Sequence, residues 1–200
     1  MSTPKQKERY QRMLQAALKE FSQKGYQEVS VDVVAKRALV SKATLYHHFQ
    51  NKEDLFLSVF DFTLHQLEHT LHDSSFSKIS DPFEKIKTGI KAFMKEVLEN
   101  SEYNFFFKAF SKNANLINNS LRQKMAERFF SSGLVFAKQN MQKAQKDGIL
   151  KSHLNIDILF HGMFGMIVHV LAYLEENKKA FSINTCAEQI AEIISRGAFA

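Results

Sequence analysis

The chain has 200 residues, of which 44% are hydrophobic and 24% charged, and its net charge is +6. This length allows one or two domains with a core that folds without cross-links, and the apolar fraction excludes wholesale disorder. Two prolines and seven glycines are few for a turn-rich β fold, so the composition predicts an all-α protein. The single cysteine, Cys186, excludes a disulfide framework and a cysteine-rich zinc module.

The positive charge is concentrated at the start of the chain. Residues 1–52 contain ten Lys and Arg against four Asp and Glu, whereas residues 53–200 contain seventeen of each kind. A basic N-terminal module beside a neutral remainder is typical of a protein whose small module meets phosphates. A basic surface without such a partner would give the same count. We expect two domains, 1–52 and 53–200.

Three helices are expected in the first domain. The first runs from about Pro4 to Lys24, where apolar residues recur at helical spacing, and Gly25 is suited to end it. Ser30 and Ser41 are favourable caps for two short helices, separated by a turn of about three residues. Two short helices joined in this way form the helix-turn-helix arrangement.

The residues around this turn resemble the DNA-binding signature of the TetR (tetracycline-repressor) family. Thr44-Leu45-Tyr46, followed by Phe49 and Lys52, is a specific combination, and the similarity covers roughly residues 8–56. The resemblance implies a three-helix DNA-binding domain followed by a six-helix ligand-binding and dimerisation domain. Leu39 and Ala43 depart from the family pattern, which often has glycine at both positions. If Leu39 is left-handed, its backbone carries strain of about 1–2 kcal/mol.

The resemblance also implies which residues face DNA. These are Ser30, Lys42, Ala43, Thr44, Tyr46, His47, His48 and Lys52. Helix starts favour phosphate, hydroxyl groups suit phosphate oxygens, and side chains on the exposed face of the third helix reach base edges. The alternative for His47 and His48 is a pair of solvated surface histidines, and it applies more to His48 than to His47.

Six helices are expected in the second domain. They start near Glu53, Pro82, Ser101, Asn115, Ile156 and Asn184, and the fourth of them extends to Lys146. The most apolar stretch, Ile156 to Leu174, is close to the length of a membrane span. It contains Asp157, His161 and His169, which hydrocarbon would penalise, so a helix buried in protein is the better interpretation. The charged N-terminus lacks a signal-peptide pattern, and we expect a cytoplasmic protein without a membrane partner.

The apolar helix and the last helix predict a homodimer. The helix from Ile156 is apolar on nearly every side, so one face needs a further partner. A two-helix interface that becomes a four-helix bundle would also satisfy a two-fold DNA site. The expected interface residues are Phe160, Phe164, Ile190, Ile193, Ile194 and Gly197.

Seventeen of the nineteen phenylalanines lie beyond residue 52, and the family resemblance implies that some line a cavity. Such a cavity would suit a hydrophobic or flat aromatic ligand. The expected lining residues are Phe62, His65, His69, Phe93, Phe107, Phe110, Phe129, Phe130, Met163 and Met166. The spacing of His65, His69 and His72 could also bind a transition metal, although a solvated stripe is the simpler interpretation and no cofactor is expected.

These features predict a ligand-responsive transcriptional regulator, most simply a repressor that binds a palindromic operator. No phosphate loop, nucleophile elbow or His-Glu-x-x-His motif is present, so an enzyme is not expected. An activator, a ligand-independent DNA-binding protein and a metal-responsive regulator are the alternatives left open.

Overall fold

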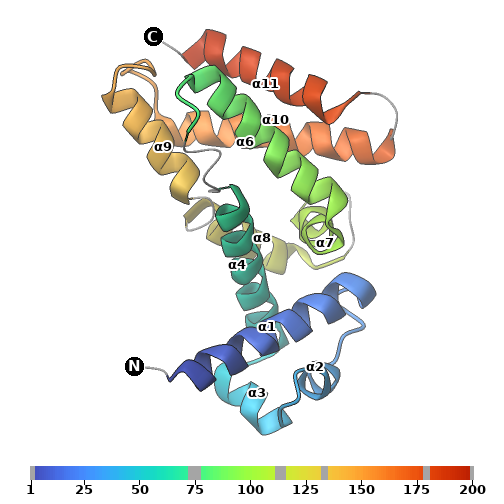
Figure 1. Ribbon diagram of the computed structural model, residues 1–200. Coiled ribbons are helices and arrows are strands. Elements are labelled where there is room, and N and C mark those ends of the chain that lie inside the picture. The colour runs from blue at the N-terminus through green and yellow to red at the C-terminus, as the bar shows by residue number, and fades with distance from the viewer. Residues whose placement is uncertain (1–2, 72–77, 111–115, 132–134, 178–180, 199–200) are drawn as a thin grey trace. The chain divides into compact units, whose positions relative to one another are not determined.

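The computed structural model describes residues 3–71, 78–110, 116–131, 135–177 and 181–198. Within these residues it contains ten α-helices and no β-strand, which confirms the all-α prediction (Figure 1). The helices are α1 Pro4–Lys24, α2 Val31–Arg37, α3 Lys42–His48, α4 Lys52–Leu71, α6 Pro82–Glu99, α7 Ser101–Phe110, α8 Asn119–Ser131, α9 Val135–Lys146, α10 Ile156–Glu176 and α11 Ile183–Ala198.

Local capping chemistry determines where the first helices begin and end. Thr3 forms a capping box with Gln6 at the start of α1, and Gly25 ends that helix with a positive φ of 81°. The hydroxyl of Ser30 accepts a hydrogen bond from the Val33 amide, and that of Ser41 accepts one from the Thr44 amide at 3.0 Å. Both serine caps are therefore confirmed.

The turn between α2 and α3 is a Schellman motif with an unusual residue at its left-handed position. The amide of Val40 donates to the Ala35 carbonyl at 3.0 Å, and the amide of Leu39 donates to the Lys36 carbonyl at 3.2 Å. Leu39 has a φ of 55° and is the one non-glycine residue with positive φ in the described part of the chain. The left-handed backbone expected at Leu39 is therefore confirmed.

Two polar contacts tie α1 to the helix-turn-helix. Arg12 donates from Nε to the carbonyl of Ala38 at 2.9 Å, which fixes the beginning of the turn. Glu20 of α1 is only 1% exposed and pairs with Arg37 of α2 at 2.5 Å and with Lys24 at 2.8 Å. Burial raises the pKa of Glu20, but hydrogen bonds and charge from Lys24 and Arg37 outweigh it, so the net pKa lies below 4.5.

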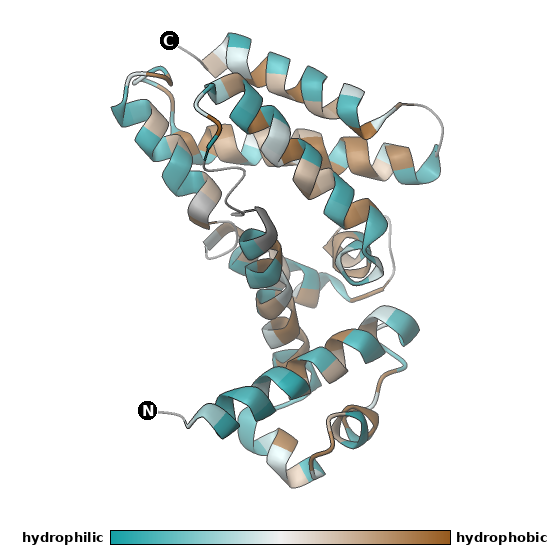
Figure 2. Ribbon diagram, in the orientation of Figure 1, coloured by the Kyte–Doolittle hydropathy of each residue, from teal (hydrophilic) through white to brown (hydrophobic). Residues whose placement is uncertain are grey.

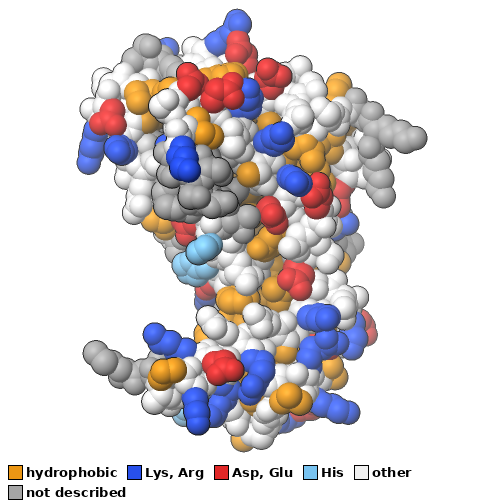
Figure 3. Space-filling view, in the orientation of Figure 1, with side chains coloured by type: hydrophobic (Ala, Val, Ile, Leu, Met, Phe, Trp, Pro, Cys, Tyr) orange, Lys and Arg blue, Asp and Glu red, His pale blue; other side chains and the backbone are white. Residues whose placement is uncertain are grey.

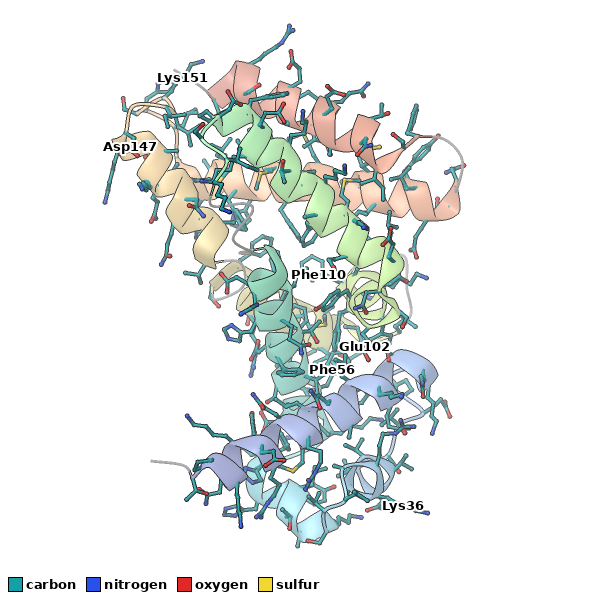
Figure 4. All side chains as sticks on the ribbon, in the orientation of Figure 1. Lys36, Phe56, Glu102, Phe110, Asp147 and Lys151 are labelled. Atoms are coloured by element: carbon teal, nitrogen blue, oxygen red, sulfur yellow. The ribbon has the colours of Figure 1, made fainter. Side chains whose placement is uncertain are left out.

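The chain divides into two compact units that are each discontinuous in sequence. Unit 1 comprises Met1–His65 and Ser101–Gly133, and unit 2 comprises Gln66–Asn100 and Leu134–Ala200. Unit 1 thus combines α1–α3 with most of α4 and with α7 and α8. Its aromatic core runs from Phe21 in α1 through Phe56 in α4, labelled in Figure 4, to Phe106 in α7. The expected domain boundary at residue 52 remains a prediction.

Unit 2 is built from α6, α9, α10 and α11. The Asp81 carboxylate accepts from the Glu84 amide at 2.7 Å, and the Asn155 side chain accepts from the Asp157 amide at 2.9 Å. These caps start α6 and α10 at the positions that the sequence predicts. α6 packs along α11, and α10 contacts α6, α9 and α11. Three helices of unit 2 therefore pack against α10.

The single helix expected from Asn115 to Lys146 is wrong. α8 ends at Ser131 and α9 begins at Val135, with residues 132–134 outside the described residues. The sequence between the two helices, Ser132-Gly133-Leu134, contains a glycine, which has low helix propensity, and the apolar periodicity on either side concealed this signal. α8 and α9 moreover belong to different units. The described helices consequently number ten rather than nine.

α10 is long and apolar enough to span a membrane by length and composition alone. One such helix is weak support for a membrane segment, because the core helix of a globular protein passes the same test. Figure 2 shows apolar residues along most of its length. Only 22% of its most apolar window is buried, so much of the helix is uncovered in the single chain.

Candidate functional site

The outer face of α3 presents a dense set of hydrogen-bonding side chains. Leu45 and Phe49 are each 1% exposed and form the buried inner face of α3 and its C-cap. Lys42, Tyr46 and both histidines are exposed on the outer face. Ala43 is also exposed, and Thr44 is half-buried. Lys and Arg side chains are spread over the visible face of α1–α3 in Figure 3. The arrangement matches a recognition helix with a cationic surround.

Two of these side chains already have partners. Lys42 forms an ion pair with Asp32 of α2 at 2.8 Å, and this hydrogen bond and charge raise the pKa of Lys42. The pair is exposed, so a phosphate or base acceptor can replace Asp32 at little cost. The Thr44 hydroxyl lies 2.8 Å from that of Ser41, which orients it at the start of α3.

The end of α3 meets the beginning of α1 through stacked rings. Tyr10 stacks on Phe49 with centroids 5.5 Å apart and contacts His48 at 5.7 Å. The rings of His47 and His48 are 5.4 Å apart. Burial lowers the pKa of His48, and the positive charges of His47 and Arg9 lower it further. Both histidines are exposed, as DNA-facing residues and solvated surface histidines alike would be, so their role stays a prediction.

Ser30 and Lys52 differ from the α3 residues in what they already bind. Ser30 is exposed and its hydroxyl caps α2. Lys52 donates from Nζ to the Gln27 carbonyl at 2.9 Å and lies 4.6 Å above the Tyr26 ring. Burial lowers its pKa, and Glu28 only partly opposes this effect. Lys52 therefore secures the α1–α2 connection to α4, a role that the sequence did not predict.

Unit 2 contains an open cavity of about 310 Å³. Two of its walls are helix faces, each with residues at a spacing of three or four. The α6 wall includes Pro82, Ile86 and Phe93, and the α9 wall includes Ala137, Met141 and Ala144. Small residues occur on both faces, with Gly89 on α6 and the two alanines on α9.

α10 provides the third wall of this cavity, which includes two residues, Phe160 and Phe164, that the sequence assigned to the dimer interface. Phe160, Phe164 and Ile167 line the space together with Met163. Phe164 packs against Phe93 of α6 with centroids 6.1 Å apart in an edge-to-face arrangement.

The charged residues around the cavity belong mainly to the start of α6 and the end of α9. Lys85 and Lys143 line it, as do Asp147 and Glu68. Asp147 and Lys151 lie at and beyond the end of α9 in Figure 4. The charged lining residues therefore number two of each sign.

Only two of the ten predicted ligand residues, Phe93 and Met163, line this cavity. Phe62, His65, Phe107, Phe110, Phe129 and Phe130 belong to unit 1. There the rings of Phe110, Phe129 and Phe130 pack against one another with centroids 5.2–6.4 Å apart; Phe129 is buried, and the other two are half-buried. In unit 2, His69 is exposed and Met166 is half-buried, and neither lines the cavity. The cavity residues that the sequence did not predict include the small ones, Gly89, Ala137 and Ala144, because apolar periodicity does not distinguish them from core residues.

The predicted subunit-interface residues divide into two groups. Phe160, Phe164, Ile190 and Ile194 are 1–7% exposed and pack inside unit 2, so they do not form its surface. Ile193 is 61% exposed, and Gly197 is exposed as well. The outward stripe of α10 instead consists of Ile158, Gly162, Gly165, His169 and Tyr173. This stripe lies opposite the cavity wall, because the two sets are half a helical turn apart.

The histidine alternative involves residues at the end of α4. His65 and His69 are exposed, and His72 lies outside the described residues. Among the described residues, no group of three or more His, Cys, Asp or Glu side chains could hold a metal ion.

Three helices packed around a buried core, with a polar face of the third helix exposed, are the arrangement of a helix-turn-helix DNA-binding protein. The sequence pattern of the family described as "Bacterial regulatory proteins, tetR family" matches residues 13–59. The chain is 31% identical over 141 residues to the uncharacterized HTH-type transcriptional regulator YhgD of Bacillus subtilis (strain 168), covering 70% of each chain. The chain belongs to the TetR family of transcriptional regulators.

Two further relatives extend over almost the whole chain. The fatty acid metabolism regulator protein of Bacillus subtilis (strain 168) is 23% identical over 189 residues, which is 94% of this chain and 95% of that protein. The crystal structure of the transcriptional regulator FadR from Bacillus subtilis in complex with stearoyl-CoA superimposes with a TM-score of 0.69 at 18% identity. It covers 94% of this chain and 98% of that one, which shows a shared fold.

Proposed function

We propose that the protein is a transcriptional repressor that binds a palindromic DNA operator as a homodimer and is released by a hydrophobic small molecule. The observation that supports this function most strongly is the exposed face of α3, which presents Lys42, Tyr46 and His47. The opposite face is held in the core by Leu45 and Phe49. Base edges in the major groove are read by side chains presented on such a helix.

The DNA-contacting residues that we propose fall into two roles. Lys42, Ala43 and His47 reach base edges, while Thr44, Tyr46 and His48 contact phosphates. Ser30 lies at the start of α2 and joins the phosphate contacts. Lys52 approaches the DNA less directly, since its ammonium binds the Gln27 carbonyl. Its contribution to affinity is expected to be smaller than that of Lys42.

A homodimer is supported by the uncovered surface of α10 and α11. Ile158 is 74% exposed, Ile193 is 61% exposed and Phe181 is 60% exposed, an unusual amount of apolar surface for one chain. Tyr173 packs beside Phe181 at 6.2 Å. A second copy would cover this surface and place two recognition helices in successive major grooves, about 34 Å apart.

The cavity of unit 2 supports a hydrophobic effector. Its volume is within the usual range for a small-molecule site, and aromatic and aliphatic side chains provide most of its wall. The names of two relatives, the fatty acid metabolism regulator and FadR with stearoyl-CoA, add weight to an apolar effector. An effector that binds better to the DNA-free geometry would release the operator by linkage.

Selection of bound sequences from random DNA by the full chain tests this function. The expected result is an enriched inverted repeat, bound with a steep dependence on salt. Lys42→Ala should weaken enrichment, whereas Lys95→Ala, an exposed lysine of α6, is the matched control and should not. No enriched sequence, with equal binding to all DNA, would contradict the proposal.

A further inference from the structure

We infer that the start of α1 forms a second DNA-contacting surface, in which Lys5 and Arg9 bind backbone phosphates beside the end of α3. This inference rests on the proposed role of α3 as the recognition helix and extends it. Both residues lie outside the set of DNA-contacting residues proposed above, which falls within positions 30–52.

Three cations follow one face of α1. Lys5, Arg9 and Arg12 are separated by four and three residues, so their side chains lie on the same side of the helix. All three residues are exposed. Glu8 is the one acidic residue in the sequence before position 20, and it lies at the edge of this row. The row therefore keeps a surplus of positive charge.

Two contacts place this row next to the helix-turn-helix. Arg12 donates from Nε to the carbonyl of Ala38, 2.9 Å away, at the turn between α2 and α3. The Tyr10 ring lies 5.7 Å from the His48 ring, measured between centroids. Figure 1 shows the start of α1 beside the end of α3. Arg9 consequently adjoins the exposed histidine end of the recognition helix.

The cations of this row differ from others of the same module in their partners. Lys42 is paired with Asp32. Within the part of the chain that the structure describes, neither Lys5 nor Arg9 forms an ion pair with a carboxylate. A phosphate oxygen can therefore bind these two side chains without displacing an acidic residue of the protein.

The cap at the start of α1 holds the row in place. The Thr3 hydroxyl accepts a hydrogen bond from the Gln6 amide at 3.3 Å, and the Gln6 side chain accepts one from the Thr3 amide at 2.7 Å. Lys5 thus belongs to a capped helix rather than to a loose tail. Cations fixed beside α3 add phosphate contacts next to those of α3, and such contacts raise affinity without reading base sequence.

The salt dependence of DNA binding tests this inference. Fluorescence anisotropy of the full chain gives the dissociation constant on the selected inverted repeat and on a shuffled duplex. The pH is 8, where His48 is uncharged because burial, His47 and Arg9 lower its pKa. Each lost phosphate contact reduces the slope of log affinity against log salt by about 0.9, so Arg9→Ala should reduce it by about 1.8 when two chains bind. Lys5→Ala should have the same effect, and both variants should weaken binding to the two duplexes by the same factor.

Lys7→Ala is the matched control for these variants. Lys7 is exposed in the same turns of α1, but it lies about 160° around the helix from Arg9. Its loss should change the slope by less than half as much. Thermal unfolding of each variant confirms that it is folded before DNA is added.

The inference fails for either residue whose alanine variant lowers the slope no more than Lys7→Ala does. It also fails if the variant weakens binding to the selected repeat alone, because that result would indicate a contact with base edges. Equal binding of the wild type to all DNA would instead contradict the proposed repressor function, and the slopes on the shuffled duplex would still decide whether Lys5 and Arg9 contact phosphates.

Discussion

Replacing Leu39 with glycine should stabilise the protein. Leu39 occupies the left-handed position of the turn with a φ of 55°, and its side chain is 80% exposed. The substitution relieves about 1–2 kcal/mol of backbone strain and loses little buried surface. The greater freedom of glycine in the unfolded chain costs roughly 0.5–1 kcal/mol. The net gain is about 0.5–1 kcal/mol, or about 1–4 °C in Tm for a chain of this size.

Urea and thermal unfolding followed by circular dichroism measure this gain. Leu39→Ala is the matched control, since it removes the exposed side chain but keeps the Cβ that causes the strain. Its stability should remain within about 0.5 kcal/mol of the wild type. A glycine variant no more stable than the alanine variant would refute the strain argument, whatever the absolute values.

Three further predictions concern the same unit. Glu20→Gln should lower the free energy of unfolding by about 2 kcal/mol at pH 7. Because the pKa of Glu20 is lowered in the folded state, the carboxylate stabilises the protein above pH 4.5 and this contribution is lost below it, so the variant should lose less stability on acidification than the wild type. An equal loss of stability in the two proteins as the pH falls would refute this. Ser41→Ala should cost about 1 kcal/mol, whereas Ser58→Ala, inside α4, should cost less. DNA affinity should rise by up to about tenfold per pH unit between pH 8 and 6, because burial, His47 and Arg9 lower the pKa of His48 and phosphate favours its protonated form. His48→Gln should make DNA affinity less dependent on pH. An unchanged dependence of affinity on pH would show that protonation of His48 does not cause it.

The features that sequence reasoning predicted well are those that depend on local chemistry. Ser41, Asp81 and Asn155 cap helices because their own side chains reach amides two or three residues away. The left-handed turn at Leu39 is likewise fixed by residues beside it in sequence. Such contacts do not depend on which distant elements pack together.

The features that could not be predicted depend on contacts distant in sequence. Phe129 and Phe130 were expected at a ligand cavity, but they belong to unit 1, where α8 packs against α7 and α7 packs against α1. Phe160 and Phe164 were expected at a subunit interface, but they point to α6 and α9, and Ile158 lies outward instead. A helix that is apolar on every side gives no hydropathy signal for which face meets which neighbour.

The most direct test of the account is the ratio of two dissociation constants for the full chain. One is measured by fluorescence anisotropy on the selected inverted repeat, and the other on a duplex of the same composition in shuffled order, at the same salt concentration. A ratio of at least about 1,000 is expected, with two chains bound per repeat, and it should fall sharply in Lys42→Ala. Equal affinity for the two duplexes, or a ratio that survives loss of both Lys42 and His47, would contradict sequence recognition by α3.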